Sequence, residues 1–401
     1  MNISIVTLGC KINQYESQLY RENFRNNGFG IKDFPEPSDI VLINTCCVTK
    51  RAEKESRNFI RRSLRNSSKV IVTGCYVEKE TQSLLEKFPI EIVKREDLLN
   101  NGYFGKKVNK IHSFYHHTRA FIKIEDGCER FCSYCIIPYV RGRVKNRNSR
   151  EILEEIKGLA ENGYREFVLT GIDLGAYEKL ADLLIEVKKI KGVGRIRLSS
   201  LEPKEITGSL IETLASSPKF CPHLHIPLQS GDDKILKLMN RDYSAGEYER
   251  LIEEIREKIP KACFTTDVMV GFPGEDKEAF CHTLAVVKRV GFSKIHCFRY
   301  SLREGTKAFK LPSPVKEEEK WERAKELRVL AEKISRKIKE NFPGKTFSVL
   351  VEEKRKEGGY SFAYSENYLP VLIEGSEKPG VIVKVRIKEI KDNCLFGVAI
   401  K

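Results

Sequence analysis

The sequence predicts an α/β protein of three parts: a flavodoxin-like parallel-sheet domain, a central partial TIM-type barrel, and a small C-terminal OB-like β-barrel. Three observations predict this arrangement. Apolar runs alternate with charged helical stretches in a short N-terminal region, the alternation recurs six times in the middle, and only short strands follow. We expect domain limits of 1–112, 113–342 and 343–401.

The N-terminal region alternates apolar runs with segments of helical length. The runs are ISIVTL, DIVLIN and KVIVTG, and a charged, helix-like stretch follows each of them. Parallel neighbouring strands need a crossover connection, which is usually a helix. This region therefore predicts a small parallel sheet covered by helices.

The middle region repeats this alternation at greater length, and a long Lys- and Glu-rich helix near 314–341 leads out of it. Its apolar runs are FIKIED, EFVLTG, RIRLSS, HLHIPL, FTTDVMVG and KIHCFRY. Six strands in series, each followed by a helix, predict a full or partial TIM-type barrel. In such barrels the chemistry gathers at the C-terminal ends of the strands.

The C-terminal region changes to short strands joined by turns that contain Gly and Pro. Its runs are FSVLVEE, YLPVLIEG, VIVKVRIKEI and CLFGVAI. Closely spaced short strands without helices predict an all-β barrel of OB-like size.

The composition limits the classes of partner and compartment. The 401 residues carry a formal net charge of +15. Such an excess favours a polyanionic partner such as nucleic acid over the alternative of a merely solvated basic surface. No signal-peptide pattern and no apolar run of membrane-spanning length occurs, so we expect a cytoplasmic protein without a membrane partner. In that reducing compartment, 12 cysteines indicate metal-binding or catalytic thiols rather than disulfides.

Three of the cysteines stand at the ends of consecutive predicted strands. Cys10 follows ISIVTLG, Cys46 follows DIVLINT, and Cys75 follows KVIVTG. In a parallel sheet these ends share one edge, which is where open α/β sheets bind ligands. We therefore expect the three thiols to converge, although strand-end cysteines are also common as small buried apolar residues.

A second group of cysteines follows the first strand of the predicted barrel. Cys128, Cys132 and Cys135 form a C-x3-C-x2-C motif in GCERFCSYCIIPYVRGR. Three thiolates without an evident fourth ligand suit a [4Fe–4S] cluster with one open iron. Zinc is the competing interpretation, but a structural zinc site needs four ligands and no second pair accompanies the motif. The aromatic Tyr134 directly before the last cysteine further favours the cluster.

This motif resembles that of the radical S-adenosylmethionine (SAM) enzymes, and further stretches resemble the methylthiotransferases among them. The C-terminal region is similar to the TRAM RNA-binding module. The stretches are TLGCKINQYES, INTCCVTKRAE, VTGCYVE, GCERFCSYCIIPYVRGR, LSSLEP, HIPLQSGDDKILKLMNRDYS and TDVMVGFPGE. Together with the C-terminal region they cover nearly the whole chain.

The resemblance implies two [4Fe–4S] clusters and SAM as cofactors. The first cluster would be held by Cys128, Cys132 and Cys135, and its open iron would bind SAM. Cleavage of SAM by one electron would give a radical that removes hydrogen from C2 of a modified adenosine. The second cluster would be held by Cys10, Cys46 and Cys75, with Cys46 preferred over its neighbour Cys47 because of the INTC match, and would supply a methylated sulfur. An electron donor such as flavodoxin or ferredoxin and an unidentified sulfur donor are also implied.

The opening motif indicates the substrate. LGCKINQYES resembles the methylthiotransferases that act on N6-threonylcarbamoyladenosine (t6A) in tRNA, at position 37 of the anticodon loop. Relatives that act on isopentenyladenosine read YGCQMN there, and those that modify ribosomal protein S12 on an aspartate read GCPKN. Both substrates stay open as alternatives, as does a non-catalytic iron–sulfur or zinc protein that binds RNA.

Candidate SAM contacts and RNA contacts have weaker signals. The SAM candidates follow predicted strands or lie in the cluster motif, and each could instead serve a turn or a helix cap; they are Tyr134, Gly171, Ser199, Ser200, Glu202 and Gln229. Basic residues at helical spacing could bind phosphate or form a solvated face; they are Arg51, Lys54, Arg57, Arg61 and Arg65. Phe362, Tyr364 and Tyr368 could stack on bases or pack in the C-terminal barrel. His223 and His225 share one strand face, and we expect them to be barrel-interior histidines rather than metal ligands.

Overall fold

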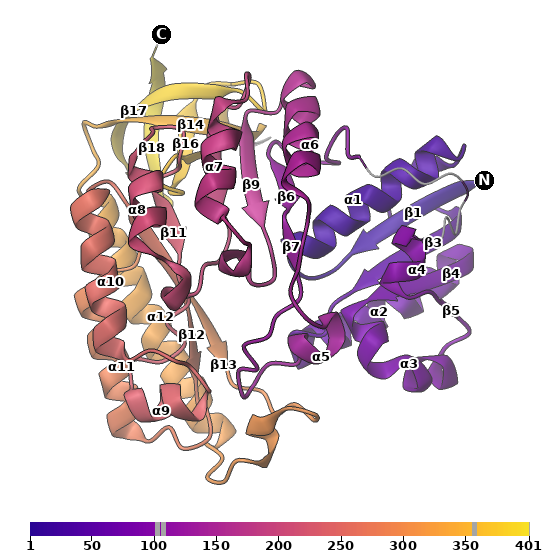
Figure 1. Cartoon of the computed structure of the whole chain (residues 1–401), viewed down its shortest axis with the longest axis horizontal. Coiled ribbons are helices and arrows are strands. Elements are labelled where there is room, and N and C mark those ends of the chain that lie inside the picture. Colours follow the sequence, from indigo (N-terminus) through magenta and orange to yellow (C-terminus); the bar gives the residue numbers. More distant parts are fainter. Residues whose placement is uncertain (101–104, 106–109, 355–358, 401) are drawn as a thin grey trace.

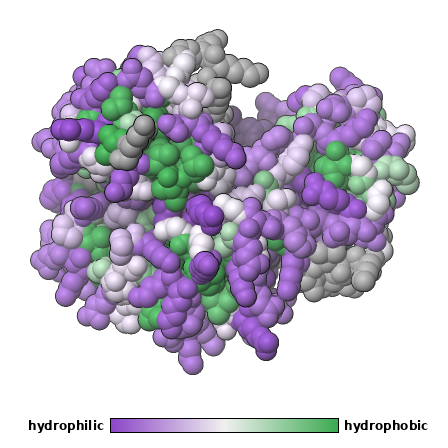
Figure 2. All heavy atoms as spheres, turned by 90° about the horizontal axis from the view of Figure 1, so that it is seen from above, coloured by the Kyte–Doolittle hydropathy of each residue, from purple (hydrophilic) through white to green (hydrophobic). Residues whose placement is uncertain are grey.

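The computed structural model describes residues 1–100, 105, 110–354 and 359–400. Figure 1 shows the N-terminal sheet and its helices beside the central barrel, with the C-terminal barrel at one end of the latter. The predicted fold class is confirmed, because all three kinds of sheet are present in the predicted order. Seen from above, the surface is mainly hydrophilic with scattered apolar patches (Figure 2). No helix in the described part of the chain is long and apolar enough to span a membrane.

The N-terminal sheet has five strands in the order β2-β1-β3-β4-β5, and every pair in it is parallel. This is the strand order of the flavodoxin-like fold. The strands are β1 (Asn2–Thr7), β2 (Gly30–Lys32), β3 (Ser38–Thr45), β4 (Ser67–Gly74) and β5 (Glu91–Ile92). The helices are α1 (Lys11–Asn26), α2 (Lys50–Asn66), α3 (Cys75–Lys87) and α4 (Arg95–Asn100). The apolar side chains of β3 are buried along its length because helices cover both faces of the sheet.

The central region is a partial barrel of six parallel strands, which confirms the TIM-type prediction in its partial form. Two three-stranded sheets, β10-β9-β6 and β11-β12-β13, meet where Ser200 pairs with His225. The barrel strands are β6 (Ala120–Lys123), β9 (Glu166–Thr170), β10 (Arg195–Leu198), β11 (His223–His225), β12 (Cys263–Val270) and β13 (Lys294–Arg299). The edge strands β6 and β13 leave one side of the barrel open, and helix α1 packs against β6.

Helices and short elements surround these strands. The helices are α5 (Ile137–Arg141), α6 (Ser149–Glu161), α7 (Leu180–Lys189), α8 (Gly208–Ala215), α9 (Asp233–Leu238), α10 (Ala245–Lys258), α11 (Lys277–Val290) and α12 (Glu317–Lys339). The short elements are the strands β7 (Glu125–Asp126) and β8 (Lys145–Asn146) and the 3-10 turns η1 (Leu174–Ala176), η2 (Pro203–Glu205) and η3 (Lys307–Lys310).

Strand β12 shows which side chains face the inside of the barrel. Phe264 and Val268 are buried in the large apolar cluster that includes Tyr248 of α10 and Val287 of α11. Successive side chains of a strand point to opposite faces. Because α10 and α11 cover the outside of the barrel, Phe264 and Val268 point outward. Asp267 and the residues two positions before and after it therefore point inward.

The C-terminal strands close into a small barrel in the order β14-β15-β16-β18-β17. They are β14 (Thr346–Lys354), β15 (Tyr360–Ser365), β16 (Pro370–Glu374), β17 (Ile382–Lys391) and β18 (Cys394–Ile400). This barrel covers the N-terminal ends of the central strands, since Arg195 at the start of β10 donates to the carbonyl oxygens of Ser348 and Tyr364 at 3.2 and 3.1 Å. The opposite end of the central barrel, where chemistry is expected, stays clear of it.

Two of the three aromatic residues proposed for RNA stacking pack against the central barrel instead. Tyr364 and Tyr368 are stacked with ring centroids 4.7 Å apart, and the guanidinium of Arg119 lies over both rings. Tyr368 also contacts the ring of His223. The packing alternative thus holds for these two tyrosines. Phe362 packs at the barrel's second apolar cluster beside Phe396.

Candidate active site

The first cysteine triad lies at one edge of the N-terminal sheet. Cys10 is the N-cap of α1, Cys46 follows β3, and Cys75 is the first residue of α3 directly after β4. The register pairs Thr7 with Asn44 and Thr45 with Gly74, so the three strands end at the same level. The structure thus places the three cysteines at one edge of the sheet, as the strand pattern predicts.

Gly9 allows the loop of Cys10 to lie directly on Cys46. Its φ of +103° is in the region that favours glycine, and a Cβ there would lie 2.9 Å from Cys46 Cβ and 3.0 Å from Cys46 Sγ. The neighbouring Cys47 is fully buried in the apolar cluster that also contains Ile43 and Ile60. Contact with the Cys10 loop therefore favours Cys46 over Cys47 as the third member of the triad.

The thiols of this triad differ in exposure and in charged neighbours. Cys10 is exposed, whereas burial raises the pKa of Cys46 to about 11. Burial also raises the pKa of Cys75, against the opposing effect of Arg141, whose Nε lies 3.2 Å from Cys75 Sγ. Each thiol would have to lose its proton to bind a metal, and a guanidinium is in place to stabilise the thiolate of Cys75.

The second cysteine triad lies in the loop between β7 and α5, at the C-terminal end of the central strands. The loop is fixed by Ser133, whose backbone N donates to Met239 O at 2.9 Å and whose Oγ donates to Leu238 O at 2.7 Å. The backbone N of Cys135 donates to Cys132 O at 2.9 Å, which folds the motif back on itself. All three thiols, including that of Cys128, are partly accessible to solvent.

Charged side chains that the sequence did not single out surround this second triad. Arg241, itself buried and paired with Glu202, has its Nη1 3.3 Å from Cys132 Sγ. Asp173 Oδ2 lies 3.6 Å from Cys128 Sγ, and burial together with this carboxylate raises the pKa of Cys128. Burial raises the pKa of Cys135 to about 11. The site thus pairs its thiols with one close cation and one close carboxylate.

The donor sets fit iron–sulfur clusters better than single zinc ions. Within the described ranges, His225, Asp267 and His296 form the three-residue group whose ligand atoms are close enough to share one ion, all within 4.8 Å of one another. The three sulfur atoms of neither cysteine triad all lie within that distance of one another. A zinc ion draws its sulfur ligands in to about 2.3 Å, whereas a [4Fe–4S] cluster holds thiolates on separate iron atoms.

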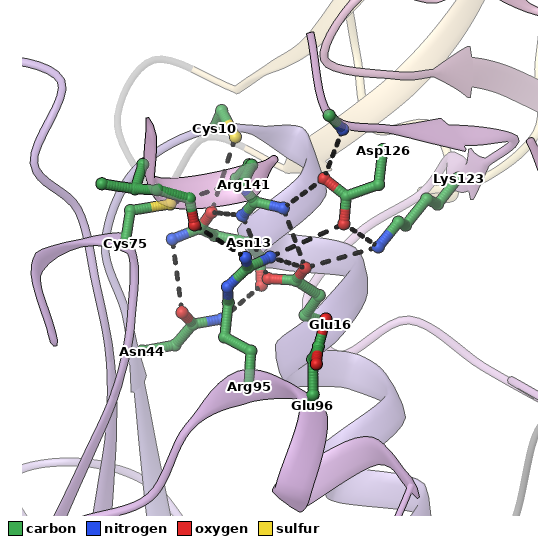
Figure 3. A network of polar contacts seen from close by, with 12 residues as sticks. Cys10, Asn13, Glu16, Asn44, Cys75, Arg95, Glu96, Lys123, Asp126 and Arg141 are labelled. Atoms are coloured by element: carbon green, nitrogen blue, oxygen red, sulfur yellow. Dashed lines mark hydrogen bonds and ion pairs between the residues drawn. The ribbon is translucent and has the colours of Figure 1, made fainter. Parts of the chain in front are cut away.

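A buried ion network joins the first triad to Asp126 and Arg141, which flank the second triad in sequence (Figure 3). Arg141, whose side chain has no exposed surface, donates to Glu16 Oε1 at 3.0 Å, Asp126 Oδ1 at 2.9 Å and Asn13 Oδ1 at 2.8 Å. Lys123 lies 3.5 Å from the same Glu16 oxygen. Burial would raise the pKa of Glu16, but Arg141 and Lys123 outweigh it and lower that pKa. Because Asn13 and Glu16 belong to α1, and Arg141 to the helix after the C-x3-C-x2-C motif, the network fixes one triad relative to the other.

The predicted SAM contacts lie at the C-terminal end of the barrel, around the second triad. Tyr134 packs edge-on against Phe272, with ring centroids 6.4 Å apart. Ser199 is buried, and its Oγ has no hydrogen-bond partner among the residues described. Glu202 pairs with Arg241, which reaches Cys132.

The other three candidates have clear structural roles of their own. A side chain at Gly171 would collide with Glu125, so this glycine allows close packing within the protein. The backbone of Ser200 forms an isolated parallel β-bridge with the backbone of His225. Gln229 has a φ of +62°, and its backbone joins the loop after β11 to Asp267 and Met269 with hydrogen bonds of 2.8 Å each. Their contact with SAM stays a prediction.

The predicted basic stripe lies on α2 beside the first triad. Arg57 donates to Tyr76 Oη at 2.6 Å, whereas the other four residues of the stripe are exposed. Arg51 pairs with Glu55 on the same helix. The helix therefore presents a partly neutralised basic face.

Comparisons with known proteins agree with this architecture. Family models match the Radical SAM superfamily at 122–287, the Uncharacterized protein family UPF0004 at 2–94, and the TRAM domain at 340–400. Among solved structures, the radical SAM methyltransferase TsrM from Kitasatospora setae has a similar fold, with a TM-score of 0.59 at 15% identity over 77% of each chain.

Two curated relatives align over nearly their whole length. The threonylcarbamoyladenosine tRNA methylthiotransferase MtaB of Chlamydia pneumoniae is 39% identical over 98% of this chain and 97% of the relative. The tRNA-2-methylthio-N(6)-dimethylallyladenosine synthase of Thermotoga petrophila is 36% identical over 99% of this chain and 96% of the relative. These comparisons confirm the predicted resemblance: the chain belongs to the radical SAM methylthiotransferase family, in its MtaB-like subfamily.

Proposed function

We propose that the protein is a tRNA methylthiotransferase that converts t6A at position 37 to 2-methylthio-t6A. The main support for this proposal is the presence of two cysteine triads, one in LGCKINQYES and its neighbouring strand ends and the other directly before the helix of Arg141, which contacts Cys75 of the first. The full-length MtaB relatives support this substrate. The two alternative substrates and the non-catalytic RNA binder are not favoured.

Cys128, Cys132 and Cys135 would hold the [4Fe–4S] cluster that binds SAM, and Cys10, Cys46 and Cys75 a second [4Fe–4S] cluster. When bound, these cofactors supply one-electron cleavage of SAM for hydrogen abstraction and a sulfur that is methylated and transferred.

The protein positions these groups and screens their charge. Arg141 stabilises the thiolate of Cys75 and Arg241 that of Cys132 through hydrogen bonds to sulfur. The predicted contacts, among them Tyr134, Ser199 and Glu202, would line the SAM site. The buried Ser199 Oγ, which has no hydrogen-bond partner among the described residues, is the clearest polar group available to SAM.

We keep the domain limits 1–112, 113–342 and 343–401 as part of this proposal.

For tRNA binding we propose the exposed basic residues of α2 and the TRAM region. The net charge of +15 supports binding to phosphates, and α2 begins shortly after Cys46. With a tRNA substrate, we expect the reaction to take place in the cytoplasm. Reduction would come from a donor such as flavodoxin or ferredoxin, together with a separate sulfur donor.

The proposal is tested with anaerobically reconstituted protein and two anticodon stem-loops, one carrying t6A and the other isopentenyladenosine at position 37. Nucleoside mass spectrometry should find the methylthio product of t6A alone. A methylthio product of isopentenyladenosine alone would move the protein to the other tRNA substrate. Loss of all activity with zinc bound and no acid-labile sulfide would instead indicate a non-catalytic binder.

A further inference from the structure

Lys11 lies on the face of helix α1 that is turned to the central barrel. Tyr15, one turn further along, donates to Glu155 Oε1 of α6 at 3.0 Å, and Glu22 Oε1 accepts from the backbone N of His112 at 3.2 Å. Residues four and eleven positions apart share one side of a helix. Lys11 therefore lies at the start of α1, directly after Cys10, on the side of the helix that faces α6 and the edge strand β6.

Three polar side chains form a group on the inner face of the barrel across from Lys11. Asp267 and His296 are register partners on β12 and β13, and His225 of β11 pairs with Thr265, two residues before Asp267. The alternation of strand side chains puts all three on the inner face. His225 Nε2 lies 3.4 Å from Asp267 Oδ2. Lys11 lies near enough to Asp267 and His296 for their charges to interact, and no fixed contact joins it to either side chain.

Lys11 differs from the buried arginines at the barrel because it has no fixed partner, a property that it shares among the described residues with Lys294 at the start of β13. Arg195 and Arg197 both pair with the buried Glu166, at 2.6 and 3.0 Å, and Arg119 pairs with Glu352. Lys11 makes no ion pair or hydrogen bond with any residue that the structure describes, and its side chain is accessible. An accessible, unpaired cation beside a polar group is suited to bind an anionic ligand group.

The chemistry of t6A supplies such a group at the right place. Its N6 substituent ends in a threonyl carboxylate and hydroxyl, whereas the isopentenyl group is an uncharged hydrocarbon. On adenine, C2 and the N6 substituent lie on the same edge, on either side of N1. A base whose C2 faces the triad of Cys10 therefore presents its N6 substituent to the adjacent Lys11.

We propose that Lys11 binds the threonyl carboxylate of t6A and that His225, Asp267 and His296 receive its hydroxyl and carbamoyl groups. This rests on the proposed function, and it identifies a specificity determinant within that site. The lysine is the cation that separates a charged from an uncharged N6 substituent. The two histidines and Asp267 supply both donors and acceptors for the neutral polar groups.

The test compares anticodon stem-loops that carry t6A or its carboxamide, in which the carboxylate is replaced by a neutral amide. Binding and methylthiolation are measured for the reconstituted wild type, Lys11→Gln, Lys11→Arg and, as a matched control, Lys157→Gln on the exposed face of α6. The wild type should bind the carboxylate RNA about tenfold to a hundredfold more tightly than the amide, the preference given by one charge-assisted hydrogen bond. Lys11→Gln should lose this preference by weakening only the carboxylate RNA, while Lys11→Arg and Lys157→Gln should keep it.

Iron content per chain, measured on every variant, separates the competing outcomes. Equal weakening of both RNAs by Lys11→Gln, with or without loss of iron, would show that Lys11 supports Cys10 or the fold and would overturn the inference. A preference that survives in Lys11→Gln would overturn it as well. Failure of the proposed function is distinguishable, because it appears as absence of product from t6A with the wild type itself.

Discussion

Replacing Arg141 by methionine should destabilise the contact between the N-terminal and central regions. The side chain is fully buried and binds Glu16, Asp126 and Asn13 within 3.0 Å. Removing one partner of a buried ion pair costs about 3–5 kcal/mol, because the remaining charge is left without compensation. Glu16 would keep Lys123 at 3.5 Å. We therefore expect the lower end of the range, a loss of about 3 kcal/mol in the free energy of unfolding.

Urea unfolding followed by circular dichroism measures this loss on the cluster-free protein. Arg143→Met is the matched control in the same segment, since its side chain is 89% exposed and its closest carboxylate oxygen, on Glu129, is 3.8 Å away. The control should change the free energy of unfolding by about 0.5 kcal/mol or less. If Arg141→Met changes it no more than the control, the buried network does not stabilise the contact, and the account of how the two triads are fixed is wrong.

Three other perturbations test separate parts of the structure. Gly9→Ala should lower the iron bound per chain, because the new Cβ would lie 2.9 Å from Cys46 Cβ at a φ of +103°; normal iron content would contradict the packing of this loop. Burial alone would raise the pKa of Glu166, but its arginine partners outweigh burial and hold this pKa below the unfolded value of about 4.3. The ionised carboxylate therefore stabilises the fold above that pH, and this stabilisation is lost as the pH falls further. Glu166→Gln should therefore flatten the acid limb of a plot of Tm against pH, and an unchanged limb would count against it. Replacing Arg61 and Arg65 on α2 by glutamate should weaken tRNA binding and reduce its salt dependence; if both stay unchanged, α2 does not contact phosphate.

The positions of the cysteines could be predicted from the sequence because they depend on regular geometry. Parallel strands of similar length end at one edge, so Cys10, Cys46 and Cys75 had to approach one another once their strands were recognised. The C-x3-C-x2-C spacing is local in sequence and needs no knowledge of the fold. The same regularity explains why the strand order and the barrel could be predicted.

The charged residues around the thiols could not be predicted in the same way. Arg241 contacts Cys132 across 109 positions, and a single arginine at that separation has no periodic signal. Arg141 and Glu16 both lie inside the quoted motifs, but a sequence of one protein does not show that they pair. Asp267 and His296 were missed because only the register of β12 and β13 makes them neighbours.

The aromatic residues of the C-terminal barrel show a second kind of contact that the sequence could not predict. Alternation along β15 gives the face of Tyr364 but not the surface that covers that face. The covering surface is the N-terminal end of the central barrel, where Arg195 and Arg197 donate to backbone carbonyls of the C-terminal strands. Contacts between domains depend on both surfaces, so neither strand pattern alone predicts them.

The two cysteine triads are expected to do different work, and a paired assay on Cys46→Ala separates their roles. Reductive SAM cleavage and formation of 2-methylthio-t6A are measured in the same reaction, with Cys47→Ala as the neighbouring control. We expect Cys46→Ala to keep measurable SAM cleavage, to form no methylthio product and to lose about half of the roughly eight irons expected for two [4Fe–4S] clusters, while Cys47→Ala keeps both activities. Loss of SAM cleavage together with the product, or full thiolation by Cys46→Ala, would contradict it.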